Sequence, residues 1–191
     1  MKKGILRYFK NAKNRLIFGH YGRNVYIHPG SRIVRPQFIS IGDNVRIGRS
    51  TNIFTHPERR DSKEIILRIE DDVHIGNYNI IGVRKSVILE ENVMLGPWVM
   101  IMDHTHHYED VEIPIKSQPM TDGAPVHLEK GCWVGAYVFI SPNVTIGRQA
   151  VIGAHSIVNR DIPPYSVAVG SPARVIKRYD FNLKQWVRVD E

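Results

Sequence analysis

Cysteine is nearly absent from this sequence. Cys132 is the only one in 191 residues, so the chain cannot form an internal disulfide, and it suits a reducing compartment. No apolar run approaches the length of a transmembrane helix. The first residues, MKKGILRYFK, are basic but lack the continuous apolar stretch and small-residue cleavage site of a signal peptide. We therefore expect a cytoplasmic protein.

The composition is otherwise that of an ordinary globular domain. Hydrophobic residues make up 42% and charged residues 24%, and the length fits a single domain spanning 1–191. The net charge of +7 is compatible with nucleic acid, an anionic membrane surface or a phosphorylated small molecule as partner. Because the sequence contains no motif typical of proteins that bind in a groove of DNA or RNA, we expect no nucleic-acid partner.

A large aliphatic residue recurs at every sixth position over most of the chain. This period fits neither an α-helix nor a long strand, but it fits very short strands separated by turns. Three such strands make one coil of about 18 residues, and stacked coils bury the aliphatic column. We expect the glycines that often follow the aliphatic residue to supply backbone conformations that other residues reach only with strain. The aliphatic positions are Ile41, Ile47, Ile53, Ile69, Ile75, Ile81, Leu89, Leu95, Ile101, Leu128, Val134, Ile140, Ile146, Ile152 and Val158.

The repeat also divides the chain into segments. A basic N-terminal segment, 1–24, precedes the β-helix at 25–178, and a tail follows at 179–191. Two stretches inside the β-helix lack the six-residue repeat of aliphatic residues, which we call the beat: a polar excursion at 54–68 and a long loop at 103–126. Since an ordered domain seldom holds so long an irregular segment without a role, we expect the long loop to be functional.

Two stretches carry a resemblance to a known family: DHTHH at 103–107, and LEKGCWVGAYVFISPNVTIGRQAVIGAHSIVNRDIPPYSVAVGSPARVIKR at 128–178. They resemble the hexapeptide-repeat acyltransferases, in the branch of galactoside, maltose, nodulation-factor and surface-polysaccharide O-acetyltransferases. The resemblance covers roughly residues 40–178. It implies an all-β, left-handed parallel β-helix with an extruded catalytic loop. It also implies acetyl-CoA as co-substrate, a sugar or glycan acceptor, no metal, and a homotrimer with active sites between subunits.

The DHTHH run contains the candidate catalytic base. Histidine suits proton transfer because its ordinary pKa lies near working pH. His104 matches the place of the family's catalytic histidine, where the coil ends and the loop begins; His106 is the second candidate and His107 the third. Asp103 either orients the imidazole, attracts the substrate toward it, or is a solvated turn residue. Since no nucleophilic side chain is required, we expect direct attack of the acceptor on the thioester.

The resemblance also implies binding residues. Backbone amides after tight turns are expected to bind acetyl-CoA and to stabilise the oxyanion, while basic side chains hold its phosphates. The cofactor set is Trp133, Ala136, Ala154, Arg160, Arg174 and Lys177. For the acceptor, Asn79 resembles an asparagine that reaches the acceptor hydroxyl in sugar acetyltransferases, and Trp98 and Tyr108 lie near enough in sequence to help line the pocket. Cys132 falls in an inward slot of its hexapeptide and is expected to pack in the core. Asn159 stands where related sequences commonly have threonine, which puts the local geometry in doubt.

Three alternatives stay open. The same coil carries acyltransferases that act on serine, drugs or amino-sugars, because a fold does not fix a function. A γ-type carbonic anhydrase shares the coil but needs three zinc histidines, and the histidine spacing here does not resemble that family. A non-catalytic scaffold would use the basic N-terminus for a peripheral contact with anionic lipid at the inner face of the membrane.

Overall fold

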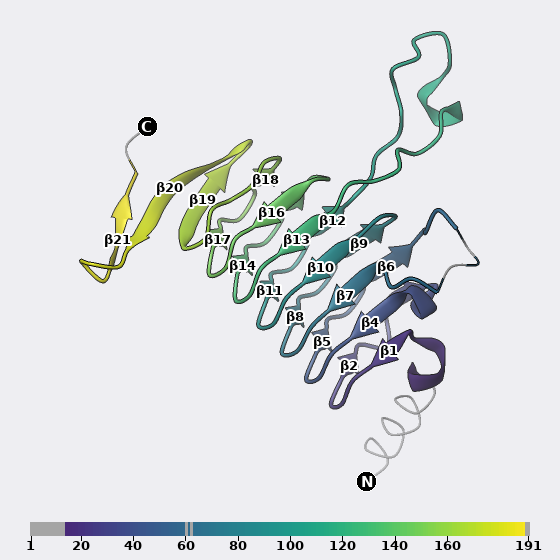
Figure 1. The fold of residues 1–191 in the computed structure, drawn as a ribbon, viewed down its shortest axis with the longest axis horizontal. Helices are drawn as coiled ribbons and strands as arrows, with labels where there is room; N and C mark the ends of the chain where they lie inside the picture. The colour runs from purple at the N-terminus through teal and green to yellow at the C-terminus, as the bar shows by residue number, and fades with distance from the viewer. Residues whose placement is uncertain (1–13, 60, 62, 190–191) are drawn as a thin grey trace.

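The computed structural model describes residues 14–59, 61 and 63–189. Their short strands wind into a left-handed parallel β-helix, which confirms the expected fold class. Figure 1 shows the coils stacked along the long axis of the molecule, with strands of successive coils side by side.

The described strands form three faces, which we call sheets A, B and C. Sheet A contains β1 (His20–Tyr21), β4 (Ile39–Ile41), β7 (Leu67–Ile69), β10 (Val87–Leu89), β13 (Val126–Leu128) and β16 (Val144–Ile146). Sheet B contains β2 (Tyr26–Ile27), β5 (Arg46–Ile47), β8 (His74–Ile75), β11 (Met94–Leu95), β14 (Trp133–Val134), β17 (Val151–Ile152), β19 (Ser166–Gly170), β20 (Ala173–Asp180) and β21 (Gln185–Arg188). Sheet C contains β3 (Arg32–Val34), β6 (Asn52–Thr55), β9 (Ile80–Val83), β12 (Met100–Met102), β15 (Phe139–Ile140) and β18 (Ile157–Val158). Residues 14–17 are helical, and the 3-10 helices are η1 (Pro36–Phe38) and η2 (Ile115–Ser117).

The aliphatic column predicted from the six-residue beat is the core of the molecule. Every position of the beat is at most 1% exposed. Parallel pairing places the equivalent aliphatic residues of successive coils next to each other: in sheet C, Ile53 pairs with Ile81, and Ile81 pairs with Ile101. Because side chains alternate across a strand, one residue of each pair of neighbours points inward and the other outward. Burial of this column is the main stabilising contribution to the coil.

The expectation for the repeat glycines is wrong in its physical reason. Positive φ occurs two residues after the glycine, at non-glycine positions such as Tyr78 (63°) and Trp98 (62°). The glycines are needed because the next coil lies too close for a side chain. A Cβ on Gly76 would lie 2.8 Å from the backbone of Gly96, and one on Gly96 would lie 2.9 Å from Ala136 N. Close backbone approach, rather than an unusual dihedral, selects glycine here.

Both interruptions of the repeat leave the coil at the same corner, between sheets C and A. The polar excursion runs from the end of β6 to β7, and the long loop runs from the end of β12 to β13. Figure 1 shows the long loop projecting from the stack. The strand between them, β9, turns into β10 through 84–86 alone. At the N-terminal end the coil already begins at β1, while 1–13, with most of the basic charge considered for a membrane contact, lies outside the described residues.

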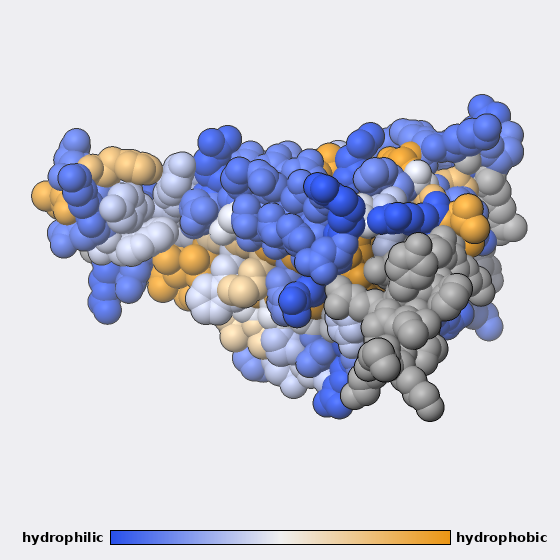
Figure 2. All heavy atoms as spheres, turned by 90° about the horizontal axis from the view of Figure 1, so that it is seen from below, coloured by the Kyte–Doolittle hydropathy of each residue, from blue (hydrophilic) through white to orange (hydrophobic). Residues whose placement is uncertain are grey.

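The surface seen in Figure 2 is largely hydrophilic, and its hydrophobic side chains gather in small patches. One patch lies at the C-terminal end, where the turn between β20 and β21 exposes Phe181 and Leu183. Within the described part of the chain, no helix is long and apolar enough to cross a membrane.

Replacing Leu89 by alanine should lower the free energy of unfolding by about 2–5 kcal/mol, because its fully buried side chain would leave a cavity in the column. Ile88 precedes it on β10 and is half-buried on the outer face. Ile88→Ala is therefore the matched control, with a smaller loss. Urea unfolding followed by circular dichroism measures both variants, and equal losses would contradict the assignment of inner and outer faces.

Candidate active site

A cavity of about 510 Å³ lies at the corner where the long loop leaves sheet C. The ends of β6, β12 and β15 supply apolar walls, and the base of the loop supplies polar ones. The lining residues are Phe54, His56, Met102, His104, Thr105, His106, Met120, Phe139, Ser141 and Pro142. His106 and Met120 face each other in an isolated antiparallel bridge, which joins the two ends of the loop. The cavity is therefore built by three coils and a closed loop base.

Asp103 is fully buried directly after β12. Its carboxyl oxygens accept hydrogen bonds from the backbone N–H groups of Arg84 (2.8 Å), Lys85 (2.7 Å) and Ser86 (2.9 Å), in the tight corner after β9. Buried backbone donors need such partners, and the carboxyl group supplies them. Asp103 is thus not a solvated turn residue.

The same carboxyl group fixes the ring of His104. Nδ1 lies 2.7 Å from Asp103 Oδ1, and the residue is only 5% exposed. Because both carboxyl oxygens already accept hydrogen bonds, Nδ1 is the donor, and Nε2 keeps its lone pair. A carboxyl group that holds an imidazole in this tautomer prepares the other nitrogen to accept a proton. The arrangement suits a general base acting on a hydroxyl group in the cavity.

The other residues of the loop are less constrained. His106 lines the same cavity but is exposed. His107 Nδ1 lies 2.9 Å from Glu109 Oε2 and does not line the cavity. Tyr108, expected to contact the acceptor, is 65% exposed and is also absent from the lining. Of the three histidines, His104 alone combines burial, a place in the cavity and a fixed tautomer.

Ala136 and Ala154 occupy equivalent turns between sheets B and C. In each turn the next residue has positive φ, 58° at both Tyr137 and His155. Among the described residues, neither alanine donates a hydrogen bond from its backbone N–H, whereas the preceding glycines donate to the next coil. Their role toward a cofactor stays a prediction, for which two backbone donors are available at this corner.

Trp98 lies in a column of stacked rings at the same corner. Its indole is sandwiched between Tyr78 and Tyr137, with centroid separations of 4.5 Å and 5.9 Å. Because both ring faces are covered, the indole presents an edge to the surroundings. Asn79 is fully buried, and its Oδ1 accepts a backbone N–H of the next coil. Neither side chain lines the cavity of His104.

The remaining cofactor candidates also lie away from this cavity. Trp133 is half-exposed on the outer face of β14 in sheet B. Arg160 is exposed after β18, and Arg174 and Lys177 lie on β20. A single chain therefore places the candidate base at one end of the sheet C strands, where Arg160 also lies, and the other candidate cofactor residues on sheet B and at its corner with sheet C.

Phe54 and His56 line the cavity but were missed in the sequence. Phe54 pairs with Gly82, which in turn pairs with Met102. Residues 54–56 and 102–104 therefore occupy the same position in two coils that are separated by one coil. His56 and His104 are therefore register equivalents, FTH matching MDH. Since three strands make one coil, assigning every third strand of the six-residue repeat to the same sheet would have shown from the sequence that His56 and His104 are equivalent.

No group of three or more His, Cys, Asp or Glu side chains in the described ranges is arranged to hold a metal ion. Cys132 is fully buried, in the inward slot expected for it. Burial raises the pKa of its thiol to about 12. Cys132 is thus a core residue with no access to a substrate.

Comparisons with known proteins agree with the fold. The family model for bacterial transferase hexapeptide (six repeats) matches residues 125–160, which defines the class as a hexapeptide-repeat transferase. Galactoside O-acetyltransferase of Escherichia coli is 32% identical over 173 residues, which are 89% of this chain and 68% of that protein. The chain belongs to the hexapeptide-repeat acetyltransferase family.

Other relatives are matched over shorter stretches. A Mycobacterium tuberculosis protein named an acetyltransferase is 36% identical over 102 residues, 53% of this chain and 34% of that protein. A Schizosaccharomyces pombe protein with a similar name is 37% identical over 105 residues, 54% of this chain and 49% of that protein. The chain thus spans about a third to a half of the length of these two relatives.

Two solved structures share the fold. An N-acyltransferase mutant from Bacillus cereus, in complex with dTDP and coenzyme A, has a TM-score of 0.75 at 24% identity, and the match covers 90% of both chains. An acetyltransferase from Vibrio cholerae complexed with acetyl coenzyme A has a TM-score of 0.58 at 24% identity, over 90% of this chain and 77% of that one.

The buried thiol yields a direct test of the core. Cys132 should not react with 5,5′-dithiobis(2-nitrobenzoate) in the folded protein at pH 8, because a pKa raised to about 12 leaves almost no thiolate and the side chain has no solvent access. The same protein in concentrated urea should react completely. Absorbance of the released thionitrobenzoate measures both rates, and fast labelling of the folded protein would contradict the burial.

Proposed function

We propose that this protein transfers an acetyl group from acetyl-CoA to a hydroxyl group of a sugar or surface glycan. The observation that carries the proposal is the buried pair of Asp103 and His104, which presents an imidazole lone pair to a cavity with apolar walls. The relative named galactoside O-acetyltransferase, which this chain matches over most of its length, supports a sugar hydroxyl as the acceptor.

In the proposed reaction, His104 Nε2 removes the proton of the acceptor hydroxyl as its oxygen attacks the thioester carbonyl carbon. The carbon–sulfur bond then breaks, and the proton passes from His104 to the leaving sulfur, so that the acetyl ester and free CoA thiol are formed. Asp103 stabilises the imidazolium that exists between these steps. No covalent intermediate on the protein is required, and Cys132 is too deeply buried to form one.

The free backbone donors at Ala136 and Ala154 suit the thioester end of the co-substrate, where a negative charge develops on oxygen. They lie at the opposite end of sheet C from His104. From Val138, where the turn ends, to Ser141, the chain advances three residues along β15, or about 10 Å of extended backbone. One subunit therefore separates the base from the donors.

A second copy of the chain would close this gap. We propose a homotrimer in which the corner between sheets B and C of one subunit faces the His104 cavity of its neighbour. Cyclic symmetry then gives three identical sites, each formed by two subunits. Neither half of such a site is complete alone.

His104→Ala should lower the rate of acetyl transfer at least about 100-fold, because a general base contributes about that much or more to such a reaction. Binding of acetyl-CoA, measured by calorimetry, should be unchanged. His106→Ala is the matched control, since it removes an exposed imidazole from the same cavity. Near-normal turnover in His104→Ala, with an inactive His106→Ala, would move the base to His106; activity in both would refute the mechanism.

Mixed oligomers test the division of the site between subunits. Ala154→Pro removes one backbone donor without disturbing the turn, because Pro97 already occupies the equivalent position between Gly96 and Trp98. Ala154→Pro and His104→Ala should each be inactive alone. When they are mixed in equal amounts, about one quarter of the sites combine an intact base with an intact donor, so about that share of activity should return.

Ala154→Ser is the control for this experiment, since it keeps the N–H and should retain activity. If mixing restores no activity, then base and donor belong to the same subunit. If Ala154→Pro is itself fully active, the amide has no part in the reaction.

A further inference from the structure

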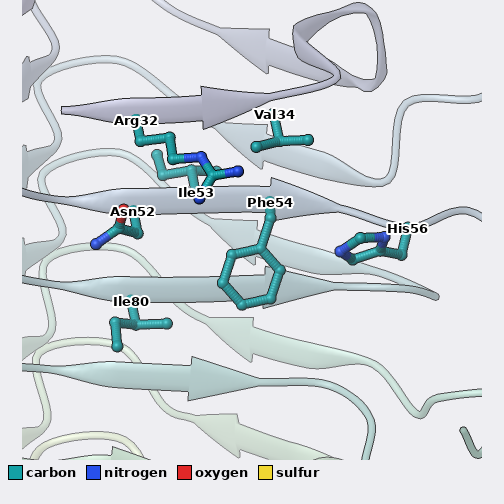
Figure 3. A pocket seen from close by; sticks show the side chains of 7 residues that line it. All are labelled: Arg32, Val34, Asn52, Ile53, Phe54, His56 and Ile80. Atoms are coloured by element: carbon teal, nitrogen blue, oxygen red, sulfur yellow. The ribbon is translucent and has the colours of Figure 1, made fainter.

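A second cavity, of about 420 Å³, adjoins the candidate active site on the outer face of sheet C. It is lined by Arg32, Val34, Asn52, Ile53, Phe54, His56 and Ile80, which come from β3, β6, β9 and the residue after β6. In Figure 3, Arg32 and His56 lie toward opposite ends of the cavity, with Phe54 between them. Phe54 and His56 also line the cavity of His104, so the two hollows share a wall.

The charge of this second cavity is positive. Arg32 is exposed, and no carboxylate of the described residues forms an ion pair with its guanidinium. Arg35 lies behind His56: its Nη1 is 2.9 Å from His56 Nδ1 and donates to the carbonyl oxygen of Thr55 at 3.1 Å. The lining contains no acidic side chain. The cavity therefore offers the Arg32 guanidinium beside apolar walls, with the positive charge of Arg35 behind His56, a setting that favours an anion.

The two cavities together are longer than one sugar ring. In sheet C, β12, β9, β6 and β3 lie side by side in this order. Three strand spacings separate β12, which precedes His104, from β3, which carries Arg32, or about 14 Å across the sheet. Arg32 is also level with Met100 in the strand register, four residues or about 13 Å before His104 along the strands. A monosaccharide in the His104 cavity would leave the second cavity empty, whereas two or more linked rings would extend over Phe54 and Ile80 toward Arg32.

We infer that the acceptor is a glycan of at least two sugar units that carries a carboxylate or phosphate group, and that this group binds beside Arg32 in the second cavity. The inference rests on the proposed function for the position of the reacting hydroxyl group. Arg32 contacts the part of the acceptor remote from that hydroxyl, so its contribution is to affinity and selectivity. The acetyl-transfer chemistry stays with His104.

Three matched disaccharides test this inference by direct binding. Cellobiose is neutral, cellobiouronic acid adds a carboxylate, and cellobiose 6′-phosphate adds a phosphate to the same backbone. Titration calorimetry on the intact protein should show one or both acidic disaccharides binding about tenfold more tightly than cellobiose, the scale expected for one charge-assisted hydrogen bond at a partly exposed site. The preference should weaken as salt is raised. The acid that binds more tightly identifies the anionic group.

Variants assign the preference to a residue. Arg32→Gln should abolish the difference between acidic and neutral disaccharides, and Arg32→Lys should restore part of it. Arg46→Gln is the matched control, because Arg46 is likewise exposed on an outer strand face, but in sheet B. It should leave the preference unchanged.

The outcomes separate this inference from the proposed function. If the acidic and neutral disaccharides bind alike, or if Arg46→Gln removes the preference as fully as Arg32→Gln, the inference is wrong, whatever the transfer assay shows. If the preference depends on Arg32 but acetyl-CoA is never consumed with any acceptor, the anion site stands and the proposed function fails.

Discussion

The pairing of each coil with the next is the interaction on which the whole structure depends. Strands of two or three residues are too short to be stable alone, and they persist because all but those at the sheet edges are paired on both sides and each coil covers one layer of the aliphatic column. This stacking leaves no room for a Cβ at Gly76 or Gly96, so the glycines follow from it. It also forces extra residues out of the coil at a corner.

The candidate base is a product of the same stacking. The corner after β9 presents the N–H groups of Arg84, Lys85 and Ser86 to the coil above it, and the carboxyl group of Asp103 accepts them. A residue needed to complete the corner thereby becomes the residue that orients His104. Structural and chemical roles coincide in one carboxyl group, so the site is as rigid as the coil that carries it.

The two ends of sheet C divide the chemistry that we propose. His104 lies where the strands end, and the free N–H groups of Ala136 and Ala154 lie where they begin. A solenoid holds its corners apart by construction, since its core fills the space between them. Association of identical solenoids is the simplest way to bring opposite corners together.

The sequence by itself determined the coil, because the recurrence of an aliphatic residue at every sixth position and the inward position of Cys132 both follow from local spacing. Through the family resemblance it also indicated His104, the second residue after the last strand before the loop. It did not reveal the place of His56, the burial of Asn79 or the ring faces covered around Trp98. The six-residue repeat contains the register of the coils, but only the tertiary structure decides which outward side chains border one cavity, which are buried and which rings stack, because these depend on the path of the loop at 103–125 and on contacts between different coils.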